Sequence, residues 1–256
     1  MDKELFVKEY LKKINFHNNL NLDLETLKKI HIQHLLHIPF DNLDIVYNKK
    51  IELDADKVLN RIINGHRGGV CYELNGLALR LLKYIGFNVK CLSGQVSDKG
   101  TLFDHNFLMV ELQNENWLFD VGLEQNFFEP LKFSINEVQK DKVGYFKIIT
   151  HEDWGYKLLY SLDGNNYKTK YLFSLQERQI EDFKPYCAFF EASITSPFVN
   201  NKICAISTEE ARISLKNDTL SITQSGVQSK TKIENNQEFV NKLKEIFNID
   251  LNTITI

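Results

Sequence analysis

The spacing of apolar side chains divides this chain into a helical first third and a remainder dominated by strands. Leu74, Leu77 and Leu81 recur at helical spacing until Gly86 interrupts the pattern, as expected of a helix with one buried face. The same period predicts helices near residues 3–14, 24–36, 55–63, 71–84 and 237–247. Between about residues 87 and 180, short apolar or alternating runs bounded by polar turns predict strands.

Two of these strands are expected to form a hairpin. His105 opens one apolar run, and a second run, which begins at Trp117, reaches Asp120 after a polar turn over residues 113–116. Antiparallel strands joined in this way would place His105 and Asp120 at one end of a sheet. A carboxylate in apolar sequence is costly without a partner. Taken singly, His105 is better explained as a buried core histidine than as a base, and Asp120 is better explained as a turn carboxylate than as an orienting acid.

Cys71 is the best candidate for a nucleophile, because it lies in the first turn of its predicted helix. Unpaired backbone N–H groups and the helix dipole favour a thiolate there, and Gly68 and Gly69 are expected to let another molecule approach the backbone. The alternative is that Cys71 is a small buried apolar residue. With His105 as base and Asp120 as orienting acid, the chain order is Cys, His, Asp.

Four other histidines could also take part in chemistry. His66 precedes the Cys71 helix in a loop and ranks second to His105 as the base. His31, His34 and His37 recur every third residue, a spacing that could let two of them ligate a metal. No carboxylate or cysteine at suitable spacing completes a set, so we expect no metal.

Composition and charge are those of an ordinary globular protein. Apolar residues make up 43% and charged residues 25% of the 256 residues, enough for a core and two or three subdomains. A net charge of −3 offers no footprint for nucleic acid and no basic membrane patch. No apolar run approaches the roughly 18 residues of a membrane span. The first residues predict a helix rather than a signal peptide, and the four widely spaced cysteines fit reduced thiols. We therefore expect a cytoplasmic protein.

Several segments resemble the arylamine N-acetyltransferase family. The signature blocks of that family are matched by Arg67-Gly68-Gly69-Val70-Cys71-Tyr72-Glu73-Leu74-Asn75, by His105 with Leu108 and Val110, and by Asp120-Val121-Gly122. An earlier stretch, Ile38-Pro39-Phe40-Asp41-Asn42-Leu43-Asp44, resembles the family's Pro-Phe-Glu-Asn-Leu stretch, with Asp41 in place of glutamate. Weaker matches occur at Phe173-Ser174-Leu175-Gln176 and Thr195-Ser196-Pro197-Phe198.

The resemblance implies an α+β fold with a catalytic core like that of cysteine proteases. It implies three parts in order: a helical bundle over residues 1–85 that carries the nucleophile, a β-barrel-like domain over 86–190 that carries His105 and Asp120, and an α/β lid over 191–256.

The resemblance also implies an enzyme that moves an acetyl group from acetyl-CoA to the nitrogen of an arylamine or hydrazine. The route would be ping-pong through acetyl-Cys71, with acetyl-CoA as co-substrate and no metal. The residues that it places at the donor and acceptor sites are Phe40, Val96, Asp104, Leu123 and Phe198.

The chain departs from the family around these sites. A second glycine is usual at the position of Glu124, where it would let backbone N–H groups approach the pyrophosphate of the donor. Glu124 adds bulk and a negative charge instead. Asp104 replaces a small hydroxyl residue, and Gln95 stands where arginine is common. Two alternatives stay open: a thiol hydrolase or transamidase with the same triad, and a non-catalytic relative that binds a CoA-like or aromatic ligand.

Overall fold

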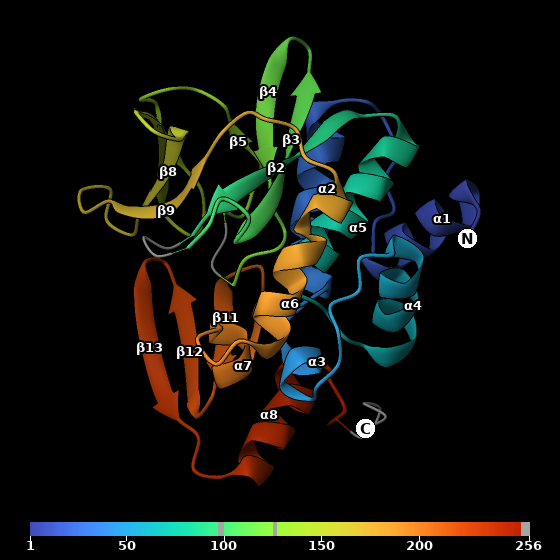
Figure 1. Ribbon diagram of the computed structural model, residues 1–256, viewed down its shortest axis with the longest axis vertical. Coiled ribbons are helices and arrows are strands. Elements are labelled where there is room, and N and C mark those ends of the chain that lie inside the picture. The colour runs from blue at the N-terminus through green and yellow to red at the C-terminus, as the bar shows by residue number, and fades with distance from the viewer. Residues whose placement is uncertain (97–99, 125–126, 252–256) are drawn as a thin grey trace.

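The computed structural model describes residues 1–96, 100–124 and 127–251, and it combines a group of helices with two antiparallel sheets (Figure 1). The mixed α and β class predicted from the sequence is confirmed. The first third of the chain supplies α1 (Lys3–Lys13), α2 (Leu24–His37), α3 (Leu43–Val46), α4 (Ala55–Gly65) and α5 (Cys71–Ile85). Asp2, Asp23 and Asp54 accept hydrogen bonds from first-turn N–H groups of α1, α2 and α4, groups that a helix leaves unpaired.

Helix α5 is the centre of the helical core. Leu74, Leu77 and Leu81 are fully buried, as their spacing predicts, and the helix packs against α1, α4, β2 and β3. Gly86 ends α5 with a positive φ of 116°, a conformation that glycine adopts at low cost. Cys71 is thereby fixed at the opposite end, as the first residue of α5.

An eight-stranded sheet in the order β5-β4-β3-β2-β9-β8-β7-β6 follows the helices. Its strands are β2 (Asn88–Gln95), β3 (His105–Leu112), β4 (Glu115–Phe119), β5 (Leu131–Lys132), β6 (Val138–Lys140), β7 (Tyr145–His151), β8 (Gly155–Ser161) and β9 (Lys168–Phe173). Strands β3 and β4 form the expected hairpin through Gln113 and Asn114, which both have positive φ, as tight hairpin turns require. Its register pairs Leu108 with Phe119. His105 and Asp120 therefore lie at the same end of the sheet.

A five-stranded sheet joins an early segment of the chain to a late one. It contains β1 (Phe40–Asp41), β10 (Ile203–Ser207), β11 (Ala211–Lys216), β12 (Thr219–Gln224) and β13 (Val227–Lys232). Phe40 of β1 lies opposite Ala205 of β10, so a segment from the helical third completes a sheet built from the last part. The sequence pattern does not predict the short helices before this sheet, which are η1 (Ile180–Phe183), α6 (Lys184–Ala192) and α7 (Pro197–Asn200).

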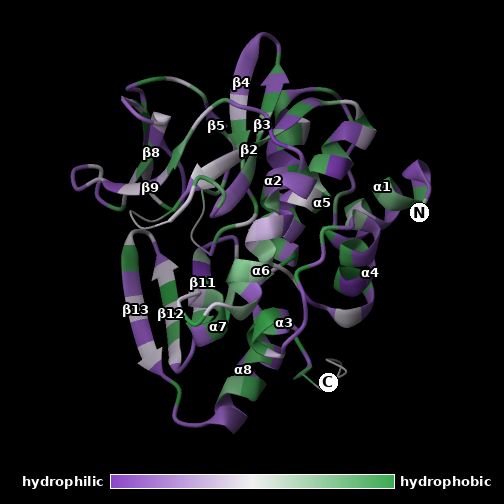
Figure 2. Cartoon of the chain, viewed as in Figure 1, coloured by the Kyte–Doolittle hydropathy of each residue, from purple (hydrophilic) through white to green (hydrophobic). Residues whose placement is uncertain are grey.

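Helix α8 (Asn236–Phe247) follows the five-stranded sheet and is amphipathic, as predicted. Phe239, Leu243 and Phe247 are buried in a core shared with Leu215 and Cys204. Figure 2 shows that α8 carries hydrophobic as well as hydrophilic residues. Along the described parts of the chain, no helix combines the length and the apolar character needed to cross a membrane.

Candidate active site

The loop before Cys71 is packed tightly against the protein's own backbone. A Cβ atom on Gly68 would lie 1.7 Å from the carbonyl oxygen of Pro39, and one on Gly69 would lie 2.6 Å from Oε2 of Glu73. The expectation that these glycines leave room for another molecule is therefore wrong. Their role is to let the loop approach β1 and the side chain of Glu73.

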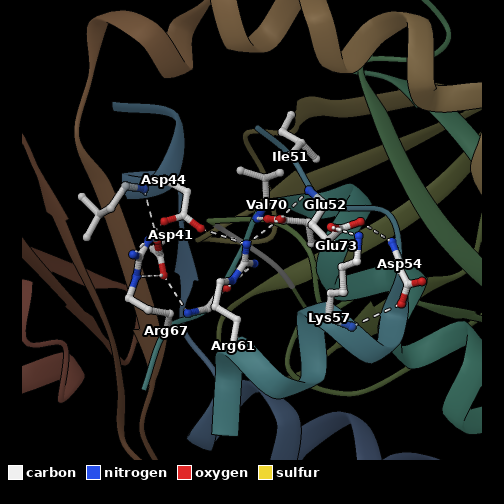
Figure 3. A network of polar contacts seen from close by, with 12 residues as sticks. Asp41, Asp44, Ile51, Glu52, Asp54, Lys57, Arg61, Arg67, Val70 and Glu73 are labelled. Atoms are coloured by element: carbon white, nitrogen blue, oxygen red, sulfur yellow. Dashed lines mark hydrogen bonds and ion pairs between the residues drawn. The ribbon is translucent and has the colours of Figure 1, made fainter. Parts of the chain in front are cut away.

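Ion pairs between buried or partly buried side chains hold this loop in place (Figure 3). Arg67 contacts the carboxylates of Asp41, at 2.5 Å, and Asp44, at 2.9 Å, and Arg61 contacts Glu73 at 2.8 Å. Burial alone would raise the pKa of Asp41, but the guanidinium of Arg67 more than offsets it, and the pKa is lowered. Removing one partner would leave a buried charge unpaired. The stability lost in this way would be far larger than the stability that the pair itself contributes.

His105 and Asp120 are in direct contact. Nε2 of His105 lies 2.8 Å from Oδ2 of Asp120, and both side chains are buried. The other oxygen of Asp120 accepts hydrogen bonds from Nδ2 of Asn75 at 2.9 Å and from the N–H of Gly122 at 3.0 Å. Burial would raise the pKa of Asp120, but His105 and Asn75 more than offset it, so the pKa is lowered. Asp120 is therefore ionised at neutral pH.

The loop after Asp120 packs directly on the start of α5. A Cβ atom on Gly122 would lie 2.5 Å from Nδ2 of Asn75 and 2.7 Å from Cα of Cys71, so a larger residue could not occupy this position without displacing the helix. Asn75 lies one helical turn after Cys71, on the same face. Its amide also donates to the carbonyl of Asn106 at 2.7 Å and accepts from the N–H of Val121 at 2.9 Å. Asn75 thus joins α5, β3 and the Asp120 loop.

Cys71 is 3% exposed. Burial raises the pKa of its thiol, while the backbone amides of Asn106 and Tyr72 lower it less strongly. The start of a helix therefore does not by itself produce the lowered pKa that the sequence suggests, and a thiolate requires a proton acceptor. Nδ1 of His105 is buried and has no hydrogen-bond partner among the described residues. A buried polar atom without a partner is unusual and costly. His105 directly precedes Asn106, the residue whose backbone amide acts on the Cys71 thiol.

The other histidines have different roles. His66 is exposed and ends α4 in a left-handed backbone conformation, and its Nδ1 lies 3.3 Å from Nδ2 of Asn248. The histidine ranked second as the base therefore lies outside the site. His34 bonds to the hydroxyl of Tyr10 and His37 to the carbonyl of Gln33. No group of three His, Cys, Asp or Glu side chains in the described ranges is arranged to hold a metal.

His31 supports the Asp120 loop, a role that sequence reasoning missed. Its Nδ1 lies 3.2 Å from the carbonyl oxygen of Phe128, and its Nε2 lies 3.0 Å from that of Asp120. The ring stacks on Phe127 and meets the edge of Phe119. Burial lowers the pKa of His31 to about 4, although the two carbonyls oppose this. The neutral ring has a single N–H, so Nδ1 can donate to Phe128 while Nε2 accepts from the backbone N–H of Asp120 at 3.4 Å. His31 thus contacts residues on either side of Leu123 and Glu124.

The residues expected at the substrate sites fall into three places. Phe40 and Leu123 line one small cavity, and the ring of Phe198 lies 6.1 Å from that of Phe40. Val96 lines a separate cleft of about 580 Å³ between the two sheets. Asp104 accepts a hydrogen bond from the backbone N–H of Thr101 and so closes a turn. Their roles toward substrates stay predictions.

Comparisons with known proteins agree on one family. A family model described as N-acetyltransferase matches residues 23–256. The arylamine N-acetyltransferase of Escherichia coli strain K12 is 32% identical over 180 residues, which cover 68% of this chain and 63% of that enzyme. Arylamine N-acetyltransferase 1 of Bos taurus is 29% identical over 94% of this chain and 93% of its own. The structure of the Mycobacterium marinum enzyme in complex with CoA superposes with a TM-score of 0.91 at 25% identity, covering 98% of this chain and 95% of that chain.

Proposed function

This chain belongs to the arylamine N-acetyltransferase family, and on that premise we propose that it transfers an acetyl group from acetyl-CoA to the nitrogen of an arylamine or hydrazine. The observation that carries the proposal is the buried set of Cys71, His105 and Asp120. Asp120 is ionised and bonded to one nitrogen of His105, and the second nitrogen has no partner in the described structure. Cys71, His105 and Asp120 are thus proposed as nucleophile, base and orienting acid.

The first half-reaction loads the enzyme. Asp120 accepts a hydrogen bond from the Nε2–H group of His105, so that Nδ1 is free to take the thiol proton of Cys71. The thiolate attacks the thioester carbonyl of the donor, and a bond forms between sulfur and the acetyl carbon. The bond to the thiol of CoA then breaks, and the departing sulfur takes the proton back from His105.

The second half-reaction transfers the acetyl group. An arylamine has low basicity and is unprotonated at neutral pH, so its nitrogen can attack acetyl-Cys71 directly. His105 accepts the proton that the nitrogen loses, and the Cys71 sulfur leaves. We propose that the aromatic rings of Phe40 and Phe198 contact the acceptor, because the two lie together near β1. Residues 1–85, 86–190 and 191–256 would then each contribute part of the site. The free state of all four cysteines is consistent with a cytoplasmic location, which we also propose.

A transfer assay tests this function. The protein is mixed with acetyl-CoA in the presence and absence of an aromatic amine, and both N-acetylated amine and free CoA are measured. Transfer is expected in the wild type and in Cys187→Ser, which removes another buried thiol, but not in Cys71→Ser. Release of CoA at the same rate without amine would indicate a hydrolase. Binding of CoA without either reaction would indicate a non-catalytic relative.

A further inference from the structure

The cleft that contains Val96 lies between the two sheets. It is bounded by β8 and β9 on one side and by β11, β12 and β13 on the other (Figure 1). Its volume of about 580 Å³ falls within the range of small-molecule sites. Among its lining residues are two exposed apolar side chains, Val96 and Leu162, and several hydroxyl and amide side chains. The cleft can therefore hold an extended ligand with polar and apolar parts.

Two cations from different sheets meet in this cleft. Lys170 lies on β9 and Arg212 on β11. Nη2 of Arg212 donates to the backbone carbonyl of Glu124 at 2.6 Å, and Nζ of Lys170 lies 5.5 Å from the ring centre of Tyr160. In the parts of the chain that the structure describes, fifteen ion pairs occur, and none of them includes Lys170 or Arg212.

Both of these charged groups are poorly hydrated. Loss of hydration, followed by repulsion from Arg212, lowers the pKa of Lys170 to about 7, and loss of hydration lowers that of Arg212 to about 10. Carboxylates lie within electrostatic range of Lys170 but do not cancel the shift; Asp120, Glu124 and Asp141 are among them. The charged side chains of Asp163 and Lys168 also line the cleft. Poorly hydrated charges without a close partner are a mark of functional sites, and an anion between the two side chains would relieve both.

We propose that Lys170 and Arg212 bind the phosphate groups of the acyl donor, so that the chain prefers a phosphate-bearing thioester to a phosphate-free one. This rests on the proposed function. Arginine suits phosphate because its planar group can donate two hydrogen bonds at once, and lysine adds a point charge. Arg212 also lines the small cavity that contains Val121 and Leu123, the residues that follow the Asp120 carboxylate. One side chain thus connects the cleft with the wall of the catalytic loop.

Kinetics with two donors test the proposal. Acetyl-CoA is compared with S-acetylpantetheine, which has the same thioester arm but lacks the pyrophosphate and the 3′-phosphoadenosine. In Lys170→Met and Arg212→Met we expect the apparent KM for acetyl-CoA to rise about tenfold to a hundredfold, the range of one lost charge-assisted hydrogen bond. The KM for S-acetylpantetheine and the kcat with either donor should stay within about twofold.

Lys157→Met is the matched control, because Lys157 is a half-buried lysine on β8 that does not line the cleft. It should leave both KM values unchanged. Lys170→Met is the cleaner test variant, since replacing an unpaired cation by an apolar side chain is not expected to harm folding. Arg212→Met also removes the bond to Glu124, so its melting temperature must be compared with that of the wild type.

Direct binding separates failure of this proposal from failure of the proposed function. If the wild type uses neither donor, the transferase assignment fails, and calorimetric binding of CoA and of pantetheine still tests the cation pair. The proposal predicts that Lys170→Met weakens the binding of CoA and leaves the binding of pantetheine unchanged. It also predicts weaker CoA binding by the wild type as pH rises from 7 to 9, because Lys170 loses its proton. Equal effects on both ligands, or inorganic phosphate that binds as tightly as CoA, would overturn it.

Discussion

Replacing Asp120 by asparagine keeps the shape of the side chain but removes the charge on which His105 depends. The carboxylate accepts hydrogen bonds from His105, from Asn75 and from the N–H of Gly122. An amide has one oxygen and one NH2 group. If the oxygen faces Asn75 and Gly122, the NH2 group faces Nε2 of His105 and forces the imidazole proton onto Nδ1. That nitrogen could then no longer take the proton of Cys71.

The size of the effect follows from these bonds. A hydrogen bond to a charged group is worth about 1.5–3 kcal/mol, which corresponds to about 10- to 150-fold in rate. The wrong tautomer adds to this loss, so we expect Asp120→Asn to lower transfer by at least about a hundredfold. If the amide turns the other way, its buried NH2 group faces the donor groups of Asn75 and Gly122, which costs about 1–3 kcal/mol of stability. For a chain of this length that is a fall in Tm of roughly 2–12 °C.

Kinetics and thermal melting of the same preparations measure both effects. Asp141→Asn is the control, because the half-buried Asp141 also accepts hydrogen bonds from backbone N–H groups, those of Phe128, Val143 and Gly144, but has no hydrogen bond to His105 in the described part of the chain. It should lower Tm without a comparable loss of kcat. A well-folded Asp120→Asn enzyme with nearly full activity would refute the reasoning and show that another group orients His105.

Three further changes probe the site. Brief iodoacetamide treatment should alkylate Cys71 far faster than Cys187. His105→Gln should abolish that difference, because burial then keeps the Cys71 thiol neutral. Equal labelling of both cysteines in the wild type would contradict the assignment of Cys71 as the nucleophile. Asn75→Ala should lower kcat by about tenfold or more, since Asp120 and Val121 each lose a partner; unchanged kinetics would mean that the carboxylate is positioned without Asn75. Glu124→Gly should lower the apparent KM for acetyl-CoA and affect S-acetylpantetheine less, because its charge lies near Lys170 and Arg212; the same response with both donors would place Glu124 away from the phosphates.

Local patterns predicted the features of the fold that local forces determine. The start of α5 at Cys71 follows from apolar spacing, and the contact between His105 and Asp120 follows from a hairpin whose register a short turn sets. The role of Asn75 was within reach, since one helical turn separates it from Cys71, but its partners lie on β3 and beyond β4.

Contacts between distant segments could not be predicted in this way. Phe40 pairs with Ala205, and Lys170 meets Arg212, only because separate sheets pack together. A single sequence carries no periodic signal for such contacts. The same limit explains the error at Gly68, since two glycines before a nucleophile indicate close approach but not which partner approaches. Here the partner is the carbonyl of Pro39.

The central claim is that Cys71 carries the acetyl group between donor and acceptor, and the intact mass of the protein tests it most directly. Incubation with acetyl-CoA and no amine should add one acetyl group, about 42 Da from its formula, as expected of a covalent intermediate. Peptide mapping should place it on Cys71, and addition of an aromatic amine should remove it. Cys71→Ser should show no adduct, because serine lacks the acidity of the thiol. An adduct that persists in Cys71→Ser, or one that the amine does not discharge, would contradict the account.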